Sequence, residues 1–406
     1  MSLYQAEKDG DVETLAGYLE RGETETVRER AATLLAGFEE EVATEALIEA
    51  VESDDSAAVR AEAIDSLDAI GVDAILECMS RIAEFEREGG ADWVAADEVA
   101  TVLESSAPEM RMAAASALGH LDEPRAVPVL VEALSDSDPR VRARVARACG
   151  TLGHARAVGP LATCLGDETA AVRREAAQSL GRIGTDGALS ALFDRVDDPS
   201  ETVRYVVVSA LGESGRPEPV PALGEALSDP SPMVRRAAVL SIVELLSEAG
   251  SQQSHAIRER VEETLTETAD VSVLDPLIEI LESGEGSVQK RNAAWLLGQL
   301  AGEAHHRQAV DGLIALLDDD DGMSAQVAVT SLVSIGGTPV EQRLITFALD
   351  EENDENARAK AVFALGQVGG ERTRERLDRL IDTTDADAVR RQAFSAVSKL
   401  DGGEAR

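Results

Sequence analysis

The feature that most constrains this chain is a short motif that recurs at a fixed interval. An apolar residue followed by arginine returns every 31 residues, at Met110-Arg111, Val141-Arg142, Val172-Arg173, Val203-Arg204 and Val234-Arg235. With small slips the register extends to Arg28, Arg60, Lys290, Ala325, Arg358 and Arg390. A repeat of this length is one supersecondary unit that buries its apolar face only against its neighbours. Residues 1–406 therefore predict a single elongated domain of about eleven units.

The sequence of each repeat unit predicts two helices. In residues 155–184, Pro160 suits the start of a first helix and Gly166 its end. The second helix carries an apolar stripe at steps of three and four, formed by Val172, Ala176, Leu180 and Ile183. We expect Gly181 and Gly184 at the helix end and in the tight turn that follows it. The predicted fold class is all-α, an α-solenoid.

The repeat motif carries a family resemblance. Residues Asp167 to Gly181 read Asp-x-x-x-x-Val-Arg-x-x-Ala-Ala-x-x-Leu-Gly. This pattern resembles HEAT repeats of armadillo-type superhelices, most closely the HEAT-like repeats named after the phycobilisome (PBS) lyases. The resemblance implies a ladder, linking adjacent repeats, of an Asp and an Arg six residues later. The matching pairs are Asp54/Arg60, Asp136/Arg142, Asp167/Arg173, Asp198/Arg204 and Asp229/Arg235. At Lys290 and Ala325 the ladder should be interrupted.

The charge balance is the second strong signal. Asp and Glu total 77 against 38 Lys and Arg, a net charge of -39, and the lysines are only Lys8, Lys290, Lys360 and Lys399. This composition resembles that of haloarchaeal proteins. Concentrated salt shortens the Debye length to about 3 Å at 1 M, so such a surface is tolerated there. Acidic runs such as 318–321 are expected to be solvated turns.

The same composition argues against several classes of partner. Nucleic-acid binding needs a basic footprint and, for exposed bases, aromatic platforms, yet aromatic residues make up 3% of the chain. No apolar run approaches the length of a membrane span, and residues 1–10 lack the pattern of a signal peptide. We therefore expect a cytoplasmic protein. Cys78, Cys149 and Cys164 lie in apolar helical positions and predict reduced core thiols.

Catalysis finds little support in the motifs. Deoxyhypusine hydroxylases, which are HEAT-like di-iron enzymes, carry His-Glu pairs in their repeats, and this chain has no His-Glu dipeptide. Phosphate-cradling loops, nucleophile elbows and metal signatures are also missing. We therefore predict no catalytic, cofactor-binding or metal-binding residue and no cofactor. The alternative is a lyase-type or cofactor-handling enzyme related to the bilin lyases, for which the repeat itself supplies no catalytic residue.

The second helices offer a candidate binding surface. Counted from the ladder arginine, positions one, two, five and nine should face outward on the concave face. The residues there predict a basic strip with apolar anchors: Arg144, Arg147, Arg174, Gln178, Tyr205, Arg236, Leu240, Arg291, Trp295 and Phe363. Arg, Trp and Tyr are enriched among residues that dominate binding energy. The strip predicts binding of an acidic protein segment. The alternative is that the arginines balance neighbouring carboxylates and Trp295 completes the core.

Two insertions and the chain ends complete the organisation. The interval from Arg60 to Arg111 is 51 residues and that from Arg235 to Lys290 is 55, which exceed the 31-residue period by 20 and 24 residues. We expect one extra helix near residues 72–90 and another near 251–270, packed on the solenoid edge or docking a partner. Residues 1–21 and 389–406 predict terminal caps, which favour a monomer.

These inferences predict a non-catalytic protein-interaction scaffold or adaptor. Its partner is expected to be a protein of unknown identity, and neither nucleic acid nor a membrane. HEAT-like proteins that this chain resembles in haloarchaea include adaptors of the taxis and motility machinery. The resemblance therefore implies a place in taxis or motility signalling.

Overall fold

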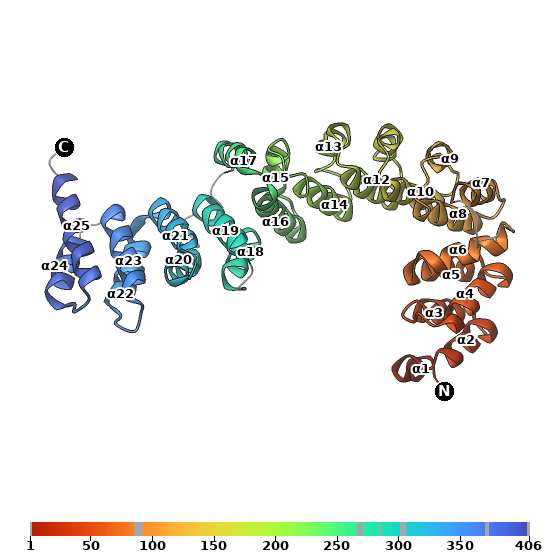
Figure 1. Cartoon of the computed structure of the whole chain (residues 1–406), viewed down its shortest axis with the longest axis horizontal. Helices are drawn as coiled ribbons and strands as arrows, with labels where there is room; N and C mark the ends of the chain where they lie inside the picture. The colour runs from red at the N-terminus through yellow and green to blue at the C-terminus, as the bar shows by residue number, and fades with distance from the viewer. Residues whose placement is uncertain are drawn as a thin grey trace. The chain divides into compact units, whose positions relative to one another are not determined.

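Helices account for the whole architecture that the structure, a computed structural model, describes. The described residues are 2–84, 92–265, 271–283, 286–300, 306–369 and 373–403. Within them lie 25 α-helices and no β-strand. The chain divides into two compact units, Met1–Ala210 and Leu211–Arg406, with the boundary inside α14 (Glu201–Gly212). In each unit, helix pairs stack in chain order (Figure 1), which confirms the prediction of an all-α solenoid.

In unit 1 the helices form two rows. The first-helix row comprises α2 (Val12–Arg21), α4 (Glu41–Ser53), α7 (Asp92–Val102), α9 (Ala126–Ala133), α11 (Val158–Cys164) and α13 (Asp186–Phe193). The second-helix row comprises α3 (Glu25–Leu35), α5 (Ala57–Ile70), α8 (Pro108–His120), α10 (Pro139–Leu152), α12 (Ala170–Ile183) and α14. The short helix α1 (Leu3–Asp9) packs against α2, and the 3-10 helix η1 (Ala155–Ala157) precedes α11.

Unit 2 repeats this arrangement. Its first helices are α15 (Val220–Ala226), α18 (Val271–Glu282), α20 (His306–Ala315), α22 (Gly337–Leu349) and α24 (Thr373–Thr383). Its second helices are α16 (Pro232–Glu248), α19 (Ser287–Leu300), α21 (Gly322–Ile335), α23 (Glu355–Val368) and α25 (Asp387–Gly403). The 3-10 helix η3 (Leu316–Asp318) follows α20 directly. Neighbouring second helices pack along the unit from α16 to α25.

The apolar stripe of each second helix forms the core between repeats. On α12, Val172, Ala176 and Leu180 are all 0% exposed, as the periodicity predicts. Full burial of a valine or leucine side chain stabilises the fold by about 1.5–3 kcal/mol. Gly153 and Gly184 end α10 and α12 with φ angles of 63° and 61°, a left-handed conformation that favours glycine. The sequence therefore ends these helices where the repeat requires a turn.

Gly181 has a different role from the one predicted, because it lies inside α12 and not at its end. A Cβ placed on Gly181 would lie 2.5 Å from the Cβ of Ala210, in the next second helix. Gly150 stands at the same position on α10, and a Cβ there would lie 2.3 Å from Ser179 Oγ. The glycine eight residues after the ladder arginine therefore lets consecutive second helices approach closely.

Each ladder arginine of the central repeats joins two repeats. Arg142 donates from Nη1 to the carbonyl oxygen of Asp136 at 2.9 Å and from Nε and Nη2 to the carboxylate of Asp167 at 2.7 and 3.0 Å. Arg173 contacts the Asp167 carbonyl and the Asp198 carboxylate in the same way. The carbonyl contact also recurs at Arg60 with Asp54, Arg204 with Asp198, and Arg235 with Asp229. The carboxylate thus pairs with the arginine of the preceding repeat.

The ladder changes its chemistry at the positions where the sequence departs from the motif. Arg60 pairs with Glu109 instead of an aspartate. Lys290 was expected to interrupt the ladder, yet its Nζ lies 3.1 Å from Asp319 Oδ2, so a lysine makes the inter-repeat pair. Ala325 is fully buried and supplies no cation. The predicted interruption is therefore wrong at Lys290, because an ammonium group also reaches the next carboxylate.

Helices occupy both places where the repeat period is exceeded. Helix α6 (Val72–Ile82) packs against α5 and α8, and α17 (Ser251–Thr264) packs against α15 and α16. Residues 85–91 and 266–270, the ends of the expected extra segments, lie outside the described residues. The single domain over residues 1–406 and the caps at residues 1–21 and 389–406 remain predictions.

Candidate functional site

The candidate site is the second-helix row, where the sequence predicts a basic strip. Its first member, Arg144 on α10, is enclosed, with a side chain only 10% exposed. Arg144 Nη1 donates to Asp68 Oδ2 at 2.9 Å and to Ser116 Oγ at 3.0 Å, and Nη2 contacts Asp65. His120 Nε2 lies 3.0 Å from Asp68 Oδ1. Burial, aided by the neighbouring Arg147, lowers the pKa of Arg144 to about 10, which leaves it charged at neutral pH. Arg144 is therefore engaged within the chain.

Two further members of the strip share one buried carboxylate. Arg147 donates to the two carboxylate oxygens of Glu175 at 3.2 and 3.3 Å, and Arg174 Nη2 donates to Oε1 at 2.7 Å. Both arginine side chains are 43% exposed, whereas that of Glu175 is 5% exposed. Burial opposes ionisation of Glu175, but the hydrogen bonds from Arg147 and Arg174 lower its pKa below the usual value. Two cations therefore hold one anion, and part of each guanidinium faces solvent.

Helix α12, in the second-helix row, presents polar and charged side chains to solvent. Arg174, Gln178 and Arg182 lie at steps of four residues on α12, and the side chains of Gln178 and Arg182 are exposed. We call these three residues the α12 stripe. Tyr205, on the next second helix, is 40% exposed. Arg147 and Arg174 contact the carboxylate of Glu175, Arg147 Nη1 also lies 3.8 Å from Asp68 Oδ2, and Arg182 adds a further exposed guanidinium group along α12.

In unit 2 the strip residues lie in more varied surroundings. Arg236 is 44% exposed and donates from Nη1 to Glu279 Oε1 at 3.3 Å. Arg291 Nη1 donates to Asp321 Oδ2 at 2.9 Å. The apolar side chain of Leu240 is 39% exposed. Of these three residues, Leu240 offers an apolar contact and Arg236 a half-exposed cation.

The two aromatic anchors of unit 2 are each covered by a cation. Arg258, from the inserted helix α17, lies over Trp295 with Cζ 4.6 Å from the ring centroid, and its Nη2 donates to Asn292 Oδ1 at 2.7 Å. Lys399 Nζ lies 5.0 Å from the ring centroid of Phe363. Cation–π contacts of this kind contribute about 0.5–2 kcal/mol. Trp295 and Phe363 are half-buried. Each ring is in contact with a cation of unit 2, Arg258 and Lys399 respectively.

Sequence reasoning missed residues that the structure brings into this surface. Asp65 and Asp68 reach Arg144 from α5, some 76 residues away in the case of Asp68. Phe394 on α25 is 58% exposed, although the equivalent position four residues after the ladder arginine is buried on α10 and α12. The repeat pattern could have identified Asp65 and Asp68 as partners of Arg144 only if the inserted segment between α5 and α8 had been placed correctly in space.

The described residues show little that would support catalysis. Within the described ranges, no group of three or more His, Cys, Asp or Glu side chains is placed to hold a metal ion. The three cysteines are buried, and burial raises the pKa of Cys78 and Cys149 to about 12 and that of Cys164 to about 11. Their thiols are therefore protonated at neutral pH and poorly nucleophilic. None of the described helices is long and apolar enough to cross a membrane.

Two solved structures resemble the chain at low sequence identity. An engineered protein covers 96% of this chain and 99% of its own, with 18% identity and a TM-score of 0.42. The complex of CpcE and CpcF of phycocyanin lyase from Nostoc sp. PCC7120 covers 79% of this chain and 98% of its own, with 21% identity and a TM-score of 0.36.

Sequence comparisons are more specific. The family model of HEAT repeats matches residues 12–84, 82–137, 127–207 and 190–257. The HEAT repeat-containing taxis protein OE_2401F of Halobacterium salinarum is 47% identical over 406 residues, which cover 99% of each chain. The acidic composition agrees with the halophilic source of that relative. These matches and the stacked helix pairs show that the chain belongs to the HEAT-repeat family.

Proposed function

We propose that this chain is a non-catalytic adaptor of taxis or motility signalling that binds a protein partner through its second-helix row. The relationship to a taxis protein, at 47% identity over the full length, supports the pathway. A row of stacked helices suits the binding of an extended partner segment, because each repeat adds side chains to one continuous surface. The partner segment is acidic.

The observation that carries this proposal is the charge of the α12 stripe together with Arg147. Arg147 and Arg174, both 43% exposed, hold one buried carboxylate, and Arg182 adds an exposed guanidinium group on α12, on a chain whose net charge is -39. Arginine forms bidentate hydrogen bonds with carboxylates, and Tyr205 adds an exposed aromatic surface. Within unit 2, Leu240 offers a separate apolar contact and Arg236 a half-exposed cation. Arg144, Arg291, Trp295 and Phe363 are partnered internally and act mainly as supports.

A variant that tests the proposal has to leave the buried contacts intact. Reversing Arg147 and Arg174 would strand the buried Glu175, and breaking such a pair costs about 3–5 kcal/mol. The double variant Arg182→Glu/Tyr205→Ala avoids this cost, because both side chains are exposed. The control Arg156→Glu/Tyr4→Ala makes the same chemical changes at exposed positions of unit 1 outside the second-helix row.

The experiment is affinity capture from the protein's own cells at native salt, followed by mass spectrometry. Wild type and the control variant should each retain a protein partner in stoichiometric amount, and Arg182→Glu/Tyr205→Ala should lose it at unchanged helicity. Equal retention by all three would overturn the binding surface. A partner-free eluate that carries metal or chromophore would instead favour the enzyme alternative.

A further inference from the structure

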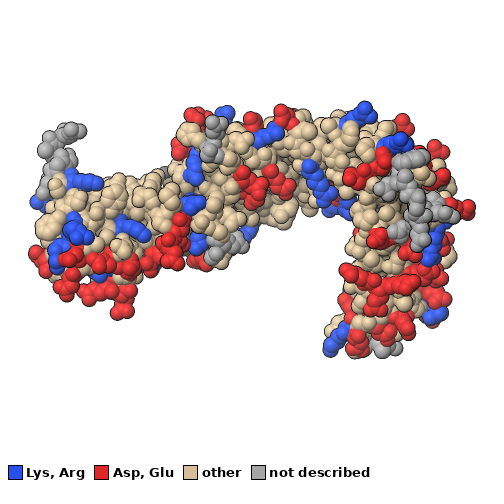
Figure 2. Space-filling view, viewed as in Figure 1, with Lys and Arg blue, Asp and Glu red and all other residues tan. Residues whose placement is uncertain are grey.

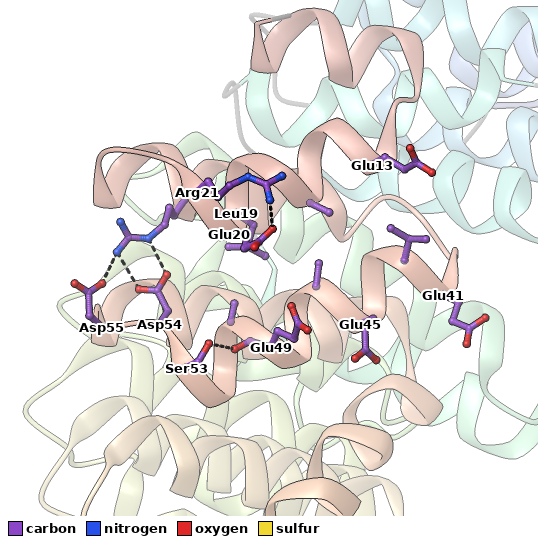
Figure 3. Close-up of a pocket in the computed structure, with 16 residues that line it drawn as sticks. Glu13, Leu19, Glu20, Arg21, Glu41, Glu45, Glu49, Ser53, Asp54 and Asp55 are labelled. Atoms are coloured by element: carbon purple, nitrogen blue, oxygen red, sulfur yellow. Dashed lines mark hydrogen bonds and ion pairs between the residues drawn. The ribbon is translucent and has the colours of Figure 1, made fainter.

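A second surface of unit 1 lies on the first-helix row, between α2 and α4. The two helices flank a cavity of about 790 Å³ (Figure 3). Its apolar lining consists of Ala16, Leu19, Val42, Ala46 and Ala50, and the Val42 side chain is 44% exposed. A volume of this size exceeds what a single ion fills and lies in the range of small-ligand sites. The groove therefore has room for whole side chains.

Carboxylates surround this apolar lining. Figure 3 shows Glu41, Glu45 and Glu49 along one side of α4. Glu45 is engaged, since it pairs with Arg81 of α6. The side chains of Glu13, Glu41 and Glu49 are exposed, and none accepts a hydrogen bond or forms an ion pair with another described residue. Figure 2 shows Asp and Glu gathered over the N-terminal part of unit 1, which contains these helices. The groove thus offers three free carboxylates from two facing helices.

Gly17 opens the groove at the middle of α2. A glycine in a helix interior costs roughly 1 kcal/mol relative to alanine. Packing explains that cost at Gly150, where a Cβ would meet the backbone of Ser179. At Gly17 a Cβ would meet only the end of the Arg21 side chain, with Nη2 at 2.9 Å. No neighbouring helix requires this glycine, and its lack of a side chain widens the groove.

Arg21 shows what kind of group the groove accepts. A second cavity of about 770 Å³ adjoins the first and shares Glu13, Gly17 and Arg21 with it. The Arg21 guanidinium lies across Gly17 where the two cavities meet. Its side chain is 71% exposed and forms an ion pair with the neighbouring Glu20, with Nη1 2.7 Å from Oε2. An exposed side chain held by one surface pair exchanges readily, because such pairs contribute about 0–1 kcal/mol. The guanidinium group of Arg21 therefore occupies a position beside Gly17 that a cation from a partner can take.

We propose that this groove binds a lysine- or arginine-bearing segment of a protein partner. The charged heads of successive basic side chains pair with Glu13, Glu41 and Glu49, which are spread along the groove, and their aliphatic stems pack on Ala16, Val42 and Ala46. Long basic side chains commonly bury their stems on apolar surface while the charge stays near water. A bare metal ion would leave the apolar lining unused. The groove selects the opposite charge from the α12 stripe, so the two surfaces bind different segments.

The test uses the full-length protein and a labelled octapeptide of alternating lysine and alanine, followed by fluorescence anisotropy. The titration is run at the lowest potassium chloride concentration that preserves the helical circular dichroism signal, because salt screens exposed charges. The groove variant is Glu13→Gln/Glu41→Gln/Glu49→Gln. The matched control, Glu98→Gln/Glu104→Gln/Glu132→Gln, removes the same charge from exposed side chains of unit 1 that form no ion pair with another described residue. Gly17→Leu fills the groove without changing the charge.

The proposal expects saturable binding by wild type, a loss of at least tenfold in affinity for the groove variant, and a loss of under twofold for the control. Gly17→Leu should also lose at least tenfold, at an unfolding temperature no lower than that of wild type. A difference of less than fivefold between the two triple variants would show a general effect of negative charge and overturn the proposal. Absence of wild-type binding would overturn it as well. So would calorimetry in which Mg²⁺, but not the peptide, binds wild type and not the groove variant.

Discussion

Substitution of Gly150 by alanine probes the contact on which the stacking of second helices depends. A Cβ at this position would lie 2.3 Å from Ser179 Oγ, 2.5 Å from Ser179 Cβ and 2.7 Å from Ser179 Cα. A side-chain rotation can relieve only the first of these overlaps. The overlap with Ser179 Cα forces the α10 and α12 backbones apart. This movement would also strain the hydrogen bond from Ser179 Oγ to the carbonyl oxygen of Ala146, which is 2.8 Å long.

The magnitude follows from three opposing contributions. Overpacking of a close-packed core costs about 1–3 kcal/mol, and loss of the Ser179 hydrogen bond costs about 1 kcal/mol more. Replacing a helix-interior glycine by alanine returns about 1 kcal/mol. The free energy of unfolding of Gly150→Ala should therefore fall by about 1–3 kcal/mol. Gly159→Ala is the control, because a Cβ there has no neighbour within 4 Å and should stabilise the fold by about 0.4–1 kcal/mol.

Urea denaturation followed by circular dichroism at fixed molar salt measures both changes. Opposite signs for the two alanine variants are the expected result. A Gly150→Ala variant as stable as wild type would refute close helix approach as the reason for the glycine. The same conclusion would follow if Gly150→Ala and Gly159→Ala changed the midpoint by the same amount.

Four further predictions follow from the ladder, the inserted helix and the charge. Asp167→Asn should lower the free energy of unfolding by about 3 kcal/mol, since it leaves the half-buried Arg142 without its anion; a loss below about 0.5 kcal/mol in urea denaturation would contradict this role. The pKa of Asp167 is lowered because hydrogen bonds from Arg142 and the Thr169 N–H outweigh the effect of burial. Its contribution is therefore full above the unfolded value near pH 4 and is lost as pH falls through the folded pKa, so a wild-type urea midpoint that stays constant from pH 5 to 2 would refute the linkage. Arg258→Ala should change the fluorescence of Trp295 by removing its cation–π partner, and an unchanged spectrum in a Trp93→Phe background would argue against that contact. The unfolding temperature should rise from dilute buffer to molar potassium chloride, because salt screens the net charge of -39, and a flat response would contradict the halophilic interpretation.

The period of the sequence predicts the fold well because it reports directly on burial between neighbouring units. Val172, Ala176 and Leu180 lie on the buried stripe where the 3.6-residue spacing places them. Gly181 was misassigned because a glycine near a helix end has two physical uses, a left-handed turn and a close helix contact. Only the position of Ala210 in space distinguishes these uses.

The candidate site was less predictable because charge pairing depends on neighbours distant in sequence. On α12, positions one, five and nine after Arg173 reach solvent as helix periodicity predicts, whereas position two, Glu175, was expected to face outward and is only 4% exposed. The partners of Arg144 were not, because Asp65 and Asp68 lie on the far side of an insertion that breaks the period. Arg258 likewise covers Trp295 from α17, whose placement the repeat could not specify. The groove at Gly17 depends on the space between α2 and α4, which no motif records.

The most direct test of the adaptor account is site-specific photo-crosslinking from the centre of the α12 stripe. A p-benzoylphenylalanine in place of Gln178, introduced in the protein's own cells, reports which peptide lies against this surface. The account predicts a crosslink to one protein, within a segment rich in Asp and Glu, and no such crosslink when the same group replaces Arg156 in η1. A partner segment rich in Lys and Arg, or equal crosslinking from both positions, would contradict the claim that the second-helix row binds an acidic partner.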